Sequence, residues 1–248
     1  MKKKMNTMRA LLRADAPLIA VSFGDTDNDR NAREAKEAGI DIAELRIDGF
    51  SRTDEDHVFT QVRAFVSVPL LATIRSAAEG GAWEGTEEER LALFRAVAPH
   101  VHAVDVELSS REILAEVIAA AHEHDTLALV SFHDFDRTPG TAELEAVVAD
   151  AKAAGADLVK VSTMARSPED LRRLAALLLT AGADIPLTVI AMGTEGSASR
   201  VFFPGLGSRI TYSFFGESFA PGQLDFAETS RLLRAFSPAY DRRRTARG

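Results

Sequence analysis

The sequence predicts an α/β protein with the (β/α)8 TIM-barrel fold in a single domain, and three observations carry this prediction. Short apolar runs recur along the chain, stretches with helical periodicity separate most of them, and the runs are evenly spaced. Alternating strands and helices imply a parallel sheet, and eight such units in 248 residues match a barrel. A doubly wound open sheet is the alternative, but the repeat is regular and no G-x-G-x-x-G motif follows the first run.

Eight apolar runs have the length and the β-branched content of buried parallel strands. They lie at residues 17–23, 41–48, 69–75, 102–108, 127–135, 157–165, 187–193 and 210–215. The segment that follows the seventh run is short and rich in glycine and serine.

The intervening helices are predicted from apolar periodicity and from capping signals. Four of them lie at 86–99, 109–124, 141–154 and 167–181. Thr86 and Glu89 form a capping box at the start of the first, and two serines that can act as caps open the second. The third ends before Gly155, and Pro168 suits the first helical position of the fourth.

No linker or composition break divides the chain, so we expect one barrel with short flanking segments. Residues 1–14 are expected to form a basic N-terminal extension, 15–238 the barrel, and 239–248 a basic C-terminal tail. The last eight residues, DRRRTARG, have no strongly apolar side chain, which predicts a solvated, frayed end.

The composition excludes several classes of protein. The chain has no cysteine, which excludes disulfides, cysteine-ligated metals and thiol catalysis. A formal net charge of −8 argues against nucleic acid or an anionic membrane as partner. No apolar run reaches the ~20 residues of a membrane-spanning helix, and the basic opening lacks the features of a secretory signal. We expect a soluble cytoplasmic protein.

Polar side chains interrupt nearly every apolar run near the end where a barrel places its active site. They are Ser22, Glu44, Arg46, Asp48, Arg75, Glu107, His133, Lys160 and, just past the seventh run, Arg200. Burying such groups is costly unless they are paired, so the set is either an active site or a group of core ion pairs.

Lys160 is the most informative of these residues. Of the six lysines, it alone lies inside an apolar run, in the sequence Leu-Val-Lys-Val. Burial lowers the pKa of an ammonium group, and the resulting neutral amine is suited to Schiff-base chemistry with a carbonyl. The alternative is a structural ion pair with an interior carboxylate such as Glu44 or Glu107.

His133 ends the fifth run, which neighbours the sixth in a barrel, so it can meet Lys160 at the barrel mouth. Imine chemistry requires proton transfers, and histidine titrates in the useful range. A hydrogen-bonded core histidine is the alternative. The remaining histidines lack metal-ligand spacing, so no metal is expected.

Anion binding is expected where glycine-rich loops follow the strands. Arg200 follows Gly193 and Gly196, and loops in this position of a barrel often hold phosphate. A bidentate contact from Arg200 to a substrate carboxylate is equally compatible with the sequence.

Taken together, these motifs resemble those of type I 3-dehydroquinate dehydratases, the Schiff-base dehydratases of the shikimate pathway, over almost the whole chain. The matching motifs are Val21-Ser22, Glu44-Leu45-Arg46-Ile47-Asp48, Thr73-Ile74-Arg75, Glu79-Gly80-Gly81, Ser131-Phe132-His133-Asp134-Phe135, Thr138-Pro139, Lys160, Met192-Gly193, Ser199-Arg200 and Ala220-Pro221-Gly222-Gln223.

The resemblance implies a role for each matching residue. The imine-forming lysine falls on Lys160, the general acid–base histidine on His133, the glutamate that orients it on Glu79, and the contact to the substrate carboxylate on Arg200. Contacts to substrate hydroxyls and ring fall on Ser22, Glu44, Arg46, Arg75 and Gln223. The resemblance also implies that no metal or organic cofactor is needed and that the protein is a homodimer.

One position departs from the family pattern, which has serine directly before Ala-Pro-Gly-Gln. Phe219 stands there, and Ser218 lies one residue earlier. Two outcomes stay open: Ser218 replaces the missing hydroxyl if the loop shifts, or substrate binding is weaker.

Two other functions remain open on the sequence alone. A class I Schiff-base aldolase would also use a lysine on the sixth strand, and it usually needs a phosphate-binding loop. A non-catalytic barrel that binds a small acid would show binding without turnover.

Overall fold

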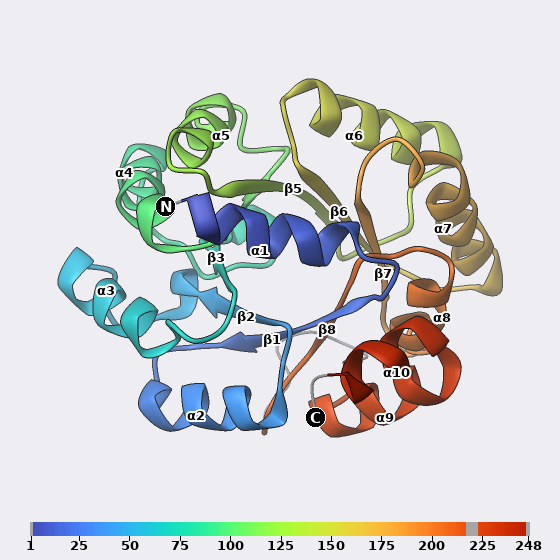
Figure 1. Ribbon diagram of the computed structural model, residues 1–248. Helices are drawn as coiled ribbons and strands as arrows, with labels where there is room; N and C mark the ends of the chain where they lie inside the picture. Colours follow the sequence, from blue (N-terminus) through green and yellow to red (C-terminus); the bar gives the residue numbers. More distant parts are fainter. Residues whose placement is uncertain (1, 217–222, 247–248) are drawn as a thin grey trace.

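The computed structural model describes residues 2–216 and 223–246, which form a (β/α)8 barrel with its strands at the centre and helices around them (Figure 1). The strands are β1 (Leu18–Phe23), β2 (Ile42–Arg46), β3 (Leu70–Thr73), β4 (Ala103–Glu107), β5 (Leu127–Asp134), β6 (Leu158–Met164), β7 (Leu187–Met192) and β8 (Ile210–Ser213). They are parallel and pair in the order β7-β6-β5-β4-β3-β2-β1-β8. The predicted fold class and all eight predicted strands are confirmed.

The barrel closes between β7 and β8 through a different kind of contact from the other seven strand pairs. One backbone bond runs from the Arg209 nitrogen to the Leu187 carbonyl at 2.9 Å. Hydroxyl groups make the others: Thr188 Oγ1 accepts from the Ile210 nitrogen at 3.2 Å, and Ser208 Oγ accepts from the Val189 nitrogen at 3.0 Å. This seam is therefore bridged largely by side chains.

Helices cover the outside of the barrel. They are α2 (Asn28–Ala38), α3 (Glu55–Ala64), α4 (Glu87–Val97), α5 (Leu114–Glu123), α6 (Thr141–Ala153), α7 (Pro168–Ala181), α8 (Ser199–Gly205) and α9 (Phe226–Phe236). Three short 3-10 helices, η1 (Ile47–Gly49), η2 (Ala77–Glu79) and η3 (Ala98–His100), lie in the connections. The outward side chains of the strands pack against these helices in one large apolar core.

The capping predictions are confirmed for three of the four helices. Thr86 and Glu89 form both bonds of the capping box, Pro168 opens α7, and Gly155 follows α6 with a φ of 101°. The prediction for the helix at 109–124 is wrong at its start, because α5 begins at Leu114 without a side-chain cap. The two serines that were expected to cap it bond to carboxylates inside the barrel instead.

Helix α1 (Lys2–Arg13) covers the N-terminal end of the barrel, where it crosses in front of the strands in Figure 1. Met8 and Leu12 are buried there against the first inward residues of the strands, among them Leu18 and Leu158. This end of the barrel is thus filled by apolar side chains, and polar side chains are concentrated toward the other end.

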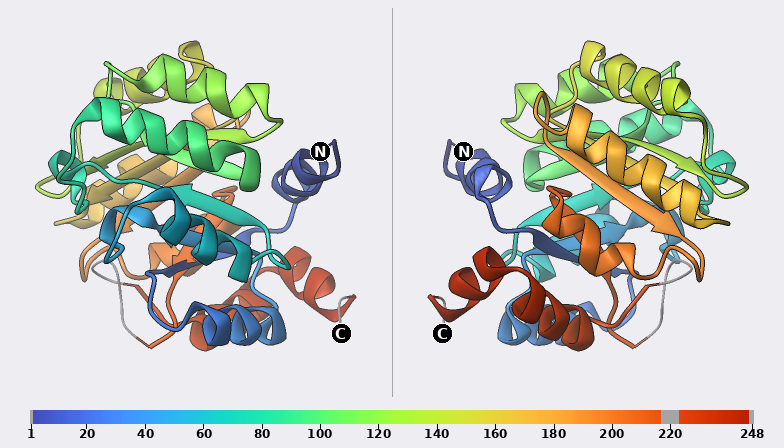
Figure 2. Two further views of the ribbon diagram at one scale, coloured as in Figure 1. Left: turned by 90° about the vertical axis from the view of Figure 1, so that its left-hand side faces the viewer. Right: turned by 90° about the vertical axis from the view of Figure 1, so that its right-hand side faces the viewer.

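The C-terminal residues differ from the expected frayed end. They form α10 (Pro238–Thr245), whose Tyr240 is fully buried. Arg243 pairs with Asp41 at 2.7 Å, and Arg244 donates to the Ala38 carbonyl at 2.8 Å. The arginines therefore dock the helix by bonding to carbonyl and carboxylate oxygens, which an apolar pattern does not reveal. Figure 2 shows α1 and α10 on the same side of the molecule.

None of the helices within residues 2–216 and 223–246 has the length and apolar character that crossing a membrane requires.

Candidate active site

A cavity lies at the C-terminal ends of the strands and gathers nearly all of the site residues expected from the sequence. Its lining consists of Ser22, Glu44, Arg46, Thr73, Arg75, Glu79, Gly80, His133, Phe135, Lys160, Ser162, Ile190, Met192, Arg200, Tyr212 and Gln223. The nine described candidates, which come from strands, connections and helix α8, therefore meet in one place. Ser218 lies outside the described residues.

Lys160 reaches this cavity from the middle of β6. The strand alternates, so that Val159 and Val161 pack outward into the apolar core while Lys160 points into the barrel. The residue is 6% exposed, and its Nζ lies 3.2 Å from Oδ2 of Asp105 on β4. Burial lowers the pKa of Lys160, and this outweighs the opposing effect of the Asp105 and Glu44 carboxylates.

The ion-pair partner of Lys160 is thus Asp105, and neither Glu44 nor Glu107 makes a bond to Nζ. Asp105 is fully buried and also pairs with Arg75 at 2.8 Å. Although burial by itself raises the pKa of Asp105, the charges of Arg75 and Lys160 lower it to about 2. Asp105 is therefore a permanent negative charge beneath the amine.

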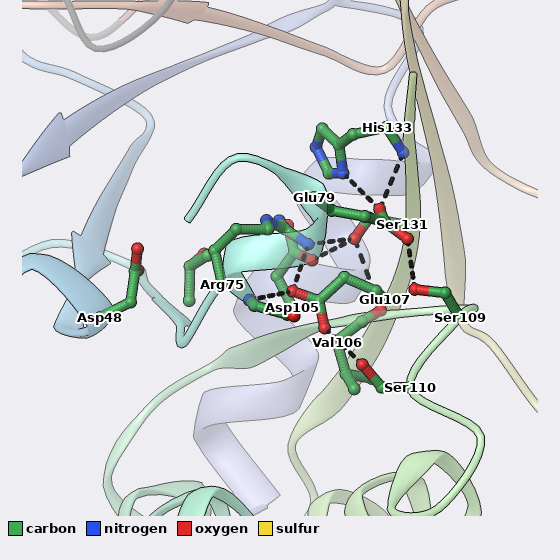
Figure 3. A network of polar contacts seen from close by, with 12 residues as sticks. Asp48, Arg75, Glu79, Asp105, Val106, Glu107, Ser109, Ser110, Ser131 and His133 are labelled. Carbon is green, nitrogen blue, oxygen red and sulfur yellow. Dashed lines mark hydrogen bonds and ion pairs between the residues drawn. The ribbon is translucent and has the colours of Figure 1, made fainter. Parts of the chain in front are cut away.

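His133 is held at the end of β5 by a single carboxylate oxygen. Glu79 Oε2 lies 3.0 Å from Nδ1 of the ring and accepts from the His133 backbone nitrogen at 2.8 Å. The Ser109 hydroxyl donates to the other oxygen of Glu79 (Figure 3). Because a carboxylate accepts the proton of Nδ1, the lone pair of the ring lies on Nε2.

The ring of His133 is kept neutral by its surroundings. Burial, followed by the positive charges of Arg75, Lys160 and Arg46, lowers its pKa well below the usual value. Burial also raises the pKa of Glu79. A neutral imidazole with an accepting Nε2 can remove a proton at neutral pH, which is the requirement of a general base.

Arg75 is the centre of a buried ionic network beneath the cavity (Figure 3). Its guanidinium pairs with Asp105 at 2.8 Å and with Glu107 at 3.1 Å, and it donates to Ser131 Oγ at 2.6 Å. Despite the effect of burial, these carboxylates raise its pKa above the usual value. Arg90 pairs with the other oxygen of Glu107 at 2.8 Å, so every carboxylate of this network has a cationic partner.

A second group of polar residues comes from β1 and β2. The Ser22 hydroxyl donates to one oxygen of Glu44, and Thr73 Oγ1 donates to the other at 2.8 Å. Arg46 makes two bonds to Asp48, at 3.0 and 2.7 Å, which is the bidentate geometry of a guanidinium on a carboxylate. These bonds fix the direction in which the side chains present their remaining donors and acceptors to the cavity.

Arg200 brings a positive charge to the cavity wall. It lies at the beginning of α8, is 3% exposed, and burial lowers its pKa to about 10. Gln223, just before α9, lines the same cavity. Arg200 remains charged at neutral pH and suits an anionic group of a ligand.

Several residues at the cavity were not predicted from the sequence. Thr73, Ser162 and Tyr212 line it, and Asp105 lies beneath it, bonded to Lys160. The signal for Asp105 was present, because it alternates with Glu107 in an otherwise apolar strand. A hydroxyl in an apolar strand, as in Ser162 and Tyr212, carries a weaker signal, because such a group is often bonded within the core.

No group of three histidine, aspartate or glutamate side chains within the described ranges is arranged to hold a metal ion.

Comparisons with known proteins point to one family. Residues 18–238 match the family model described as type I 3-dehydroquinase. A 3-dehydroquinate dehydratase of Methanothrix thermoacetophila is 36% identical over 225 residues, covering 90% of this chain and 93% of the relative.

Two solved structures have the same fold. The 3-dehydroquinate dehydratase of Geobacillus kaustophilus HTA426 superposes with a TM-score of 0.84 at 31% identity, covering 90% of this chain and 91% of that one. The type I 3-dehydroquinate dehydratase of Clostridium difficile, solved with covalently modified comenic acid, gives a TM-score of 0.82 at 29% identity, covering 89% and 92% of the two chains.

Proposed function

The chain belongs to the type I 3-dehydroquinase family, and from that premise we propose that it dehydrates 3-dehydroquinate to 3-dehydroshikimate through an imine on Lys160. This is a hydro-lyase reaction of the shikimate pathway, which leads to the aromatic amino acids. The observation that carries the proposal is a buried amine with a lowered pKa in the same cavity as the Glu79–His133 pair.

In this proposal Lys160 is the nucleophile. The neutral amine attacks the ketone of the substrate, and loss of water gives an iminium ion. The iminium draws electrons from the neighbouring carbon and so acidifies its C–H bond. The covalently modified ligand in the Clostridium difficile relative supports covalent chemistry in this family.

His133 carries the protons. Nε2 takes the proton from the acidified carbon, and the electrons of that C–H bond move into the iminium. The same electron pair then moves back to form a C=C bond and expels the hydroxyl group on the next carbon. This hydroxyl group leaves as water, with the proton that His133 delivers. A second water hydrolyses the imine, so that the product is released and the amine is regenerated. Glu79 holds the ring in the required tautomer throughout.

The other lining residues position the substrate. We assign the carboxylate of the substrate to Arg200, and its hydroxyls and ring to Ser22, Glu44, Arg46, Arg75 and Gln223. Ser218 is a further candidate hydroxyl contact. The charge of Arg200 supports its assignment, and a fixed carboxylate brings the reacting carbons beside Lys160 and His133.

An ultraviolet assay for the conjugated enone product tests the reaction. Absorbance that rises with 3-dehydroquinate, together with a borohydride-stable adduct of one reduced ligand on wild type and none on Lys160→Ala, supports the proposal. Binding without turnover would favour a non-catalytic barrel, and competition by phosphorylated substrates would favour an aldolase. An adduct that persists in Lys160→Ala would refute the assignment of the lysine.

We also propose that the protein is a cytoplasmic homodimer whose catalytic barrel spans residues 15–238. Membership of the family supports this assembly and location. Light scattering on the purified protein tests it, with twice the chain mass expected and a single chain mass contradicting it. Fractionation of the native cell tests the location.

A further inference from the structure

Tyr212 occupies a place beside Lys160 that the proposed reaction has not used. It lies on β8, where it pairs in register with Ala20 of β1, and its side chain points into the barrel. Lys160 Nζ is 4.4 Å from the centre of its ring. The residue is 4% exposed and forms part of the cavity wall, so its ring covers one side of the reacting nitrogen.

The hydroxyl of Tyr212 is buried and has no hydrogen-bond partner among the described residues. A buried hydroxyl without a partner is costly, and buried polar groups are nearly always bonded. The chain's other tyrosine, Tyr240, shows the usual situation, because its hydroxyl bonds to Ser230 Oγ at 3.0 Å. An unpartnered hydroxyl in the wall of a ligand cavity indicates that the ligand supplies its partner.

The hydroxyl can act only through its proton as a donor or through its lone pairs, and its surroundings favour donation. Burial, followed by the negative charges of Glu44 and Asp105, raises the pKa of Tyr212 well above its usual value. The group therefore stays protonated. It can donate a hydrogen bond to an oxygen that gains negative charge. Because it does not lose its own proton at neutral pH, it does not act as a base.

We propose that Tyr212 donates a hydrogen bond to the carbonyl oxygen of the keto substrate while Lys160 attacks the carbonyl carbon, so that Tyr212 stabilises the charge that develops on that oxygen. This inference rests on the proposed imine chemistry of Lys160. Of all substrate oxygens, the one on the attacked carbon must come closest to Nζ, and the ring of Tyr212 contacts Nζ. A hydrogen-bond donor that is already oriented in a site without water stabilises a transition state most when it faces the atom on which charge develops.

The step balances with one proton from the solvent as its only further reactant. A bond forms between Nζ and the carbon, and the π electrons of the carbonyl move onto its oxygen, where the Tyr212 hydroxyl donates. One proton leaves the nitrogen and one arrives on the oxygen, which gives the neutral carbinolamine. The nitrogen lone pair then forms the C=N bond, and the oxygen leaves as water with the electrons of the C–O bond and a second proton. This second proton is taken up from the solvent, and its charge remains on the iminium ion.

Ser162 is the competing candidate for the same role. Its hydroxyl is also buried, also lacks a partner among the described residues, and also lines the cavity. The register, however, places Ser162 opposite His133 of β5 and Ile190 of β7, and no hydrogen bond joins it to Lys160, whereas the ring of Tyr212 lies against Nζ. The geometry therefore favours Tyr212 for the oxygen at the lysine.

The test compares Tyr212→Phe with Tyr240→Phe, which makes the same substitution at a bonded hydroxyl far from the cavity. Each enzyme is mixed with saturating 3-dehydroquinate, quenched with borohydride after increasing times, and analysed by mass spectrometry for the reduced adduct. Because phenylalanine keeps the ring against Nζ, we expect Tyr212→Phe to form the adduct about 10²-fold more slowly than wild type. Tyr240→Phe should form it at the wild-type rate.

Thermal unfolding of the ligand-free proteins gives a second readout. Tyr212→Phe should melt a few degrees higher than wild type, because it removes an unsatisfied buried hydroxyl, whereas Tyr240→Phe should not gain stability. Slower adduct formation together with a raised melting temperature supports the proposal. A merely structural role of the hydroxyl would lower both the rate of adduct formation and the melting temperature.

Three results would overturn it. Equal adduct rates in Tyr212→Phe and wild type would do so, as would an increase in KM alone, which would place the hydroxyl on another substrate oxygen. A lower melting temperature for Tyr212→Phe would show that the hydroxyl is already bonded without ligand. If wild type itself forms no adduct, the imine chemistry fails and this inference fails with it, an outcome that the wild-type sample alone identifies.

Discussion

Asp105 Oδ2 lies 3.2 Å from Lys160 Nζ and 2.8 Å from Arg75 Nη2, so one buried oxygen serves both the reactive amine and the guanidinium beneath it. The carboxylate opposes deprotonation of the lysine, while burial favours it. The charge state of Lys160 is thus set by two adjacent effects that substitution can separate.

Asp105→Asn should shift the lysine toward its neutral form. Without the carboxylate charge, the pKa of Lys160 should fall further, and the acid limb of borohydride trapping against pH should move to lower pH. The lost partner of Arg75 should also cost about 3 kcal/mol of folding free energy, measured by urea unfolding. Glu107→Gln is the matched control, since Glu107 contacts Arg75 but makes no bond to Nζ. An unmoved pH limb in Asp105→Asn would contradict this account.

Glu79→Gln should impair proton transfer and leave the cavity intact. The amide can still accept from the His133 backbone nitrogen, but it removes the charge that fixes the ring. We expect kcat to fall by about 10²-fold, a typical contribution of general acid–base catalysis. Ser109→Ala, which removes only the hydroxyl bonded to Glu79, should cause a much smaller fall. The idea fails if both variants lose activity equally.

The neutral state of His133 should make the protein less stable as the pH falls. Its pKa is lower in the folded protein than in the unfolded chain, so below about pH 6.5 the unfolded chain binds a proton that the folded protein does not. Stability should therefore fall with decreasing pH, by about 1.4 kcal/mol per unit from this group. Urea unfolding between pH 7 and 5.5 should show a steeper loss for wild type than for His133→Gln. Parallel curves for the two proteins would argue against a depressed histidine.

Arg243→Ala should reduce stability without changing catalysis. It removes the 2.7 Å bond to Asp41, whose side chain is 1% exposed and otherwise receives the Ile19 nitrogen at 2.9 Å. A charged hydrogen bond of this kind contributes about 2 kcal/mol, which corresponds to a melting temperature lower by roughly 4–8 °C. Arg242→Ala, at an exposed position on the same helix, should melt like wild type. Because Arg243 lies at the opposite end of the barrel from the cavity, a lower kcat in Arg243→Ala would be unexpected.

Hydrophobic patterning predicted the strands and the inward residues well, because burial of alternate side chains in a barrel leaves a local signal. It placed Lys160 and His133 in one cavity. The hydrophobic pattern did not identify Asp105 as the partner of Lys160. The choice of partner depends on how the tilted strands are staggered around the barrel. Glu107 and Lys160 both pair in register with Ser131, yet Asp105, two residues earlier on β4, makes the bond.

The errors at 109–110 and at the C-terminus have a common cause. Ser109 and Ser110 match the pattern of helix caps, but the carboxylates of Glu79 and Glu107 are stronger acceptors at close range. Arg243 and Arg244 lack an apolar neighbour in sequence, but their partners lie about two hundred residues earlier in the chain. Polar partners that are distant in sequence leave no periodic pattern.

The docking of α10 onto Asp41, together with the pairing of β1 with β8, also bears on how the polypeptide is made. Residues 18–41, which leave the ribosome early, contain backbone and carboxylate groups whose partners are among the last to be synthesised. One edge of β1 and the carboxylate of Asp41 must therefore remain exposed to solvent, without these partners, during nearly the whole of translation. The barrel can close only when synthesis of the chain is almost complete.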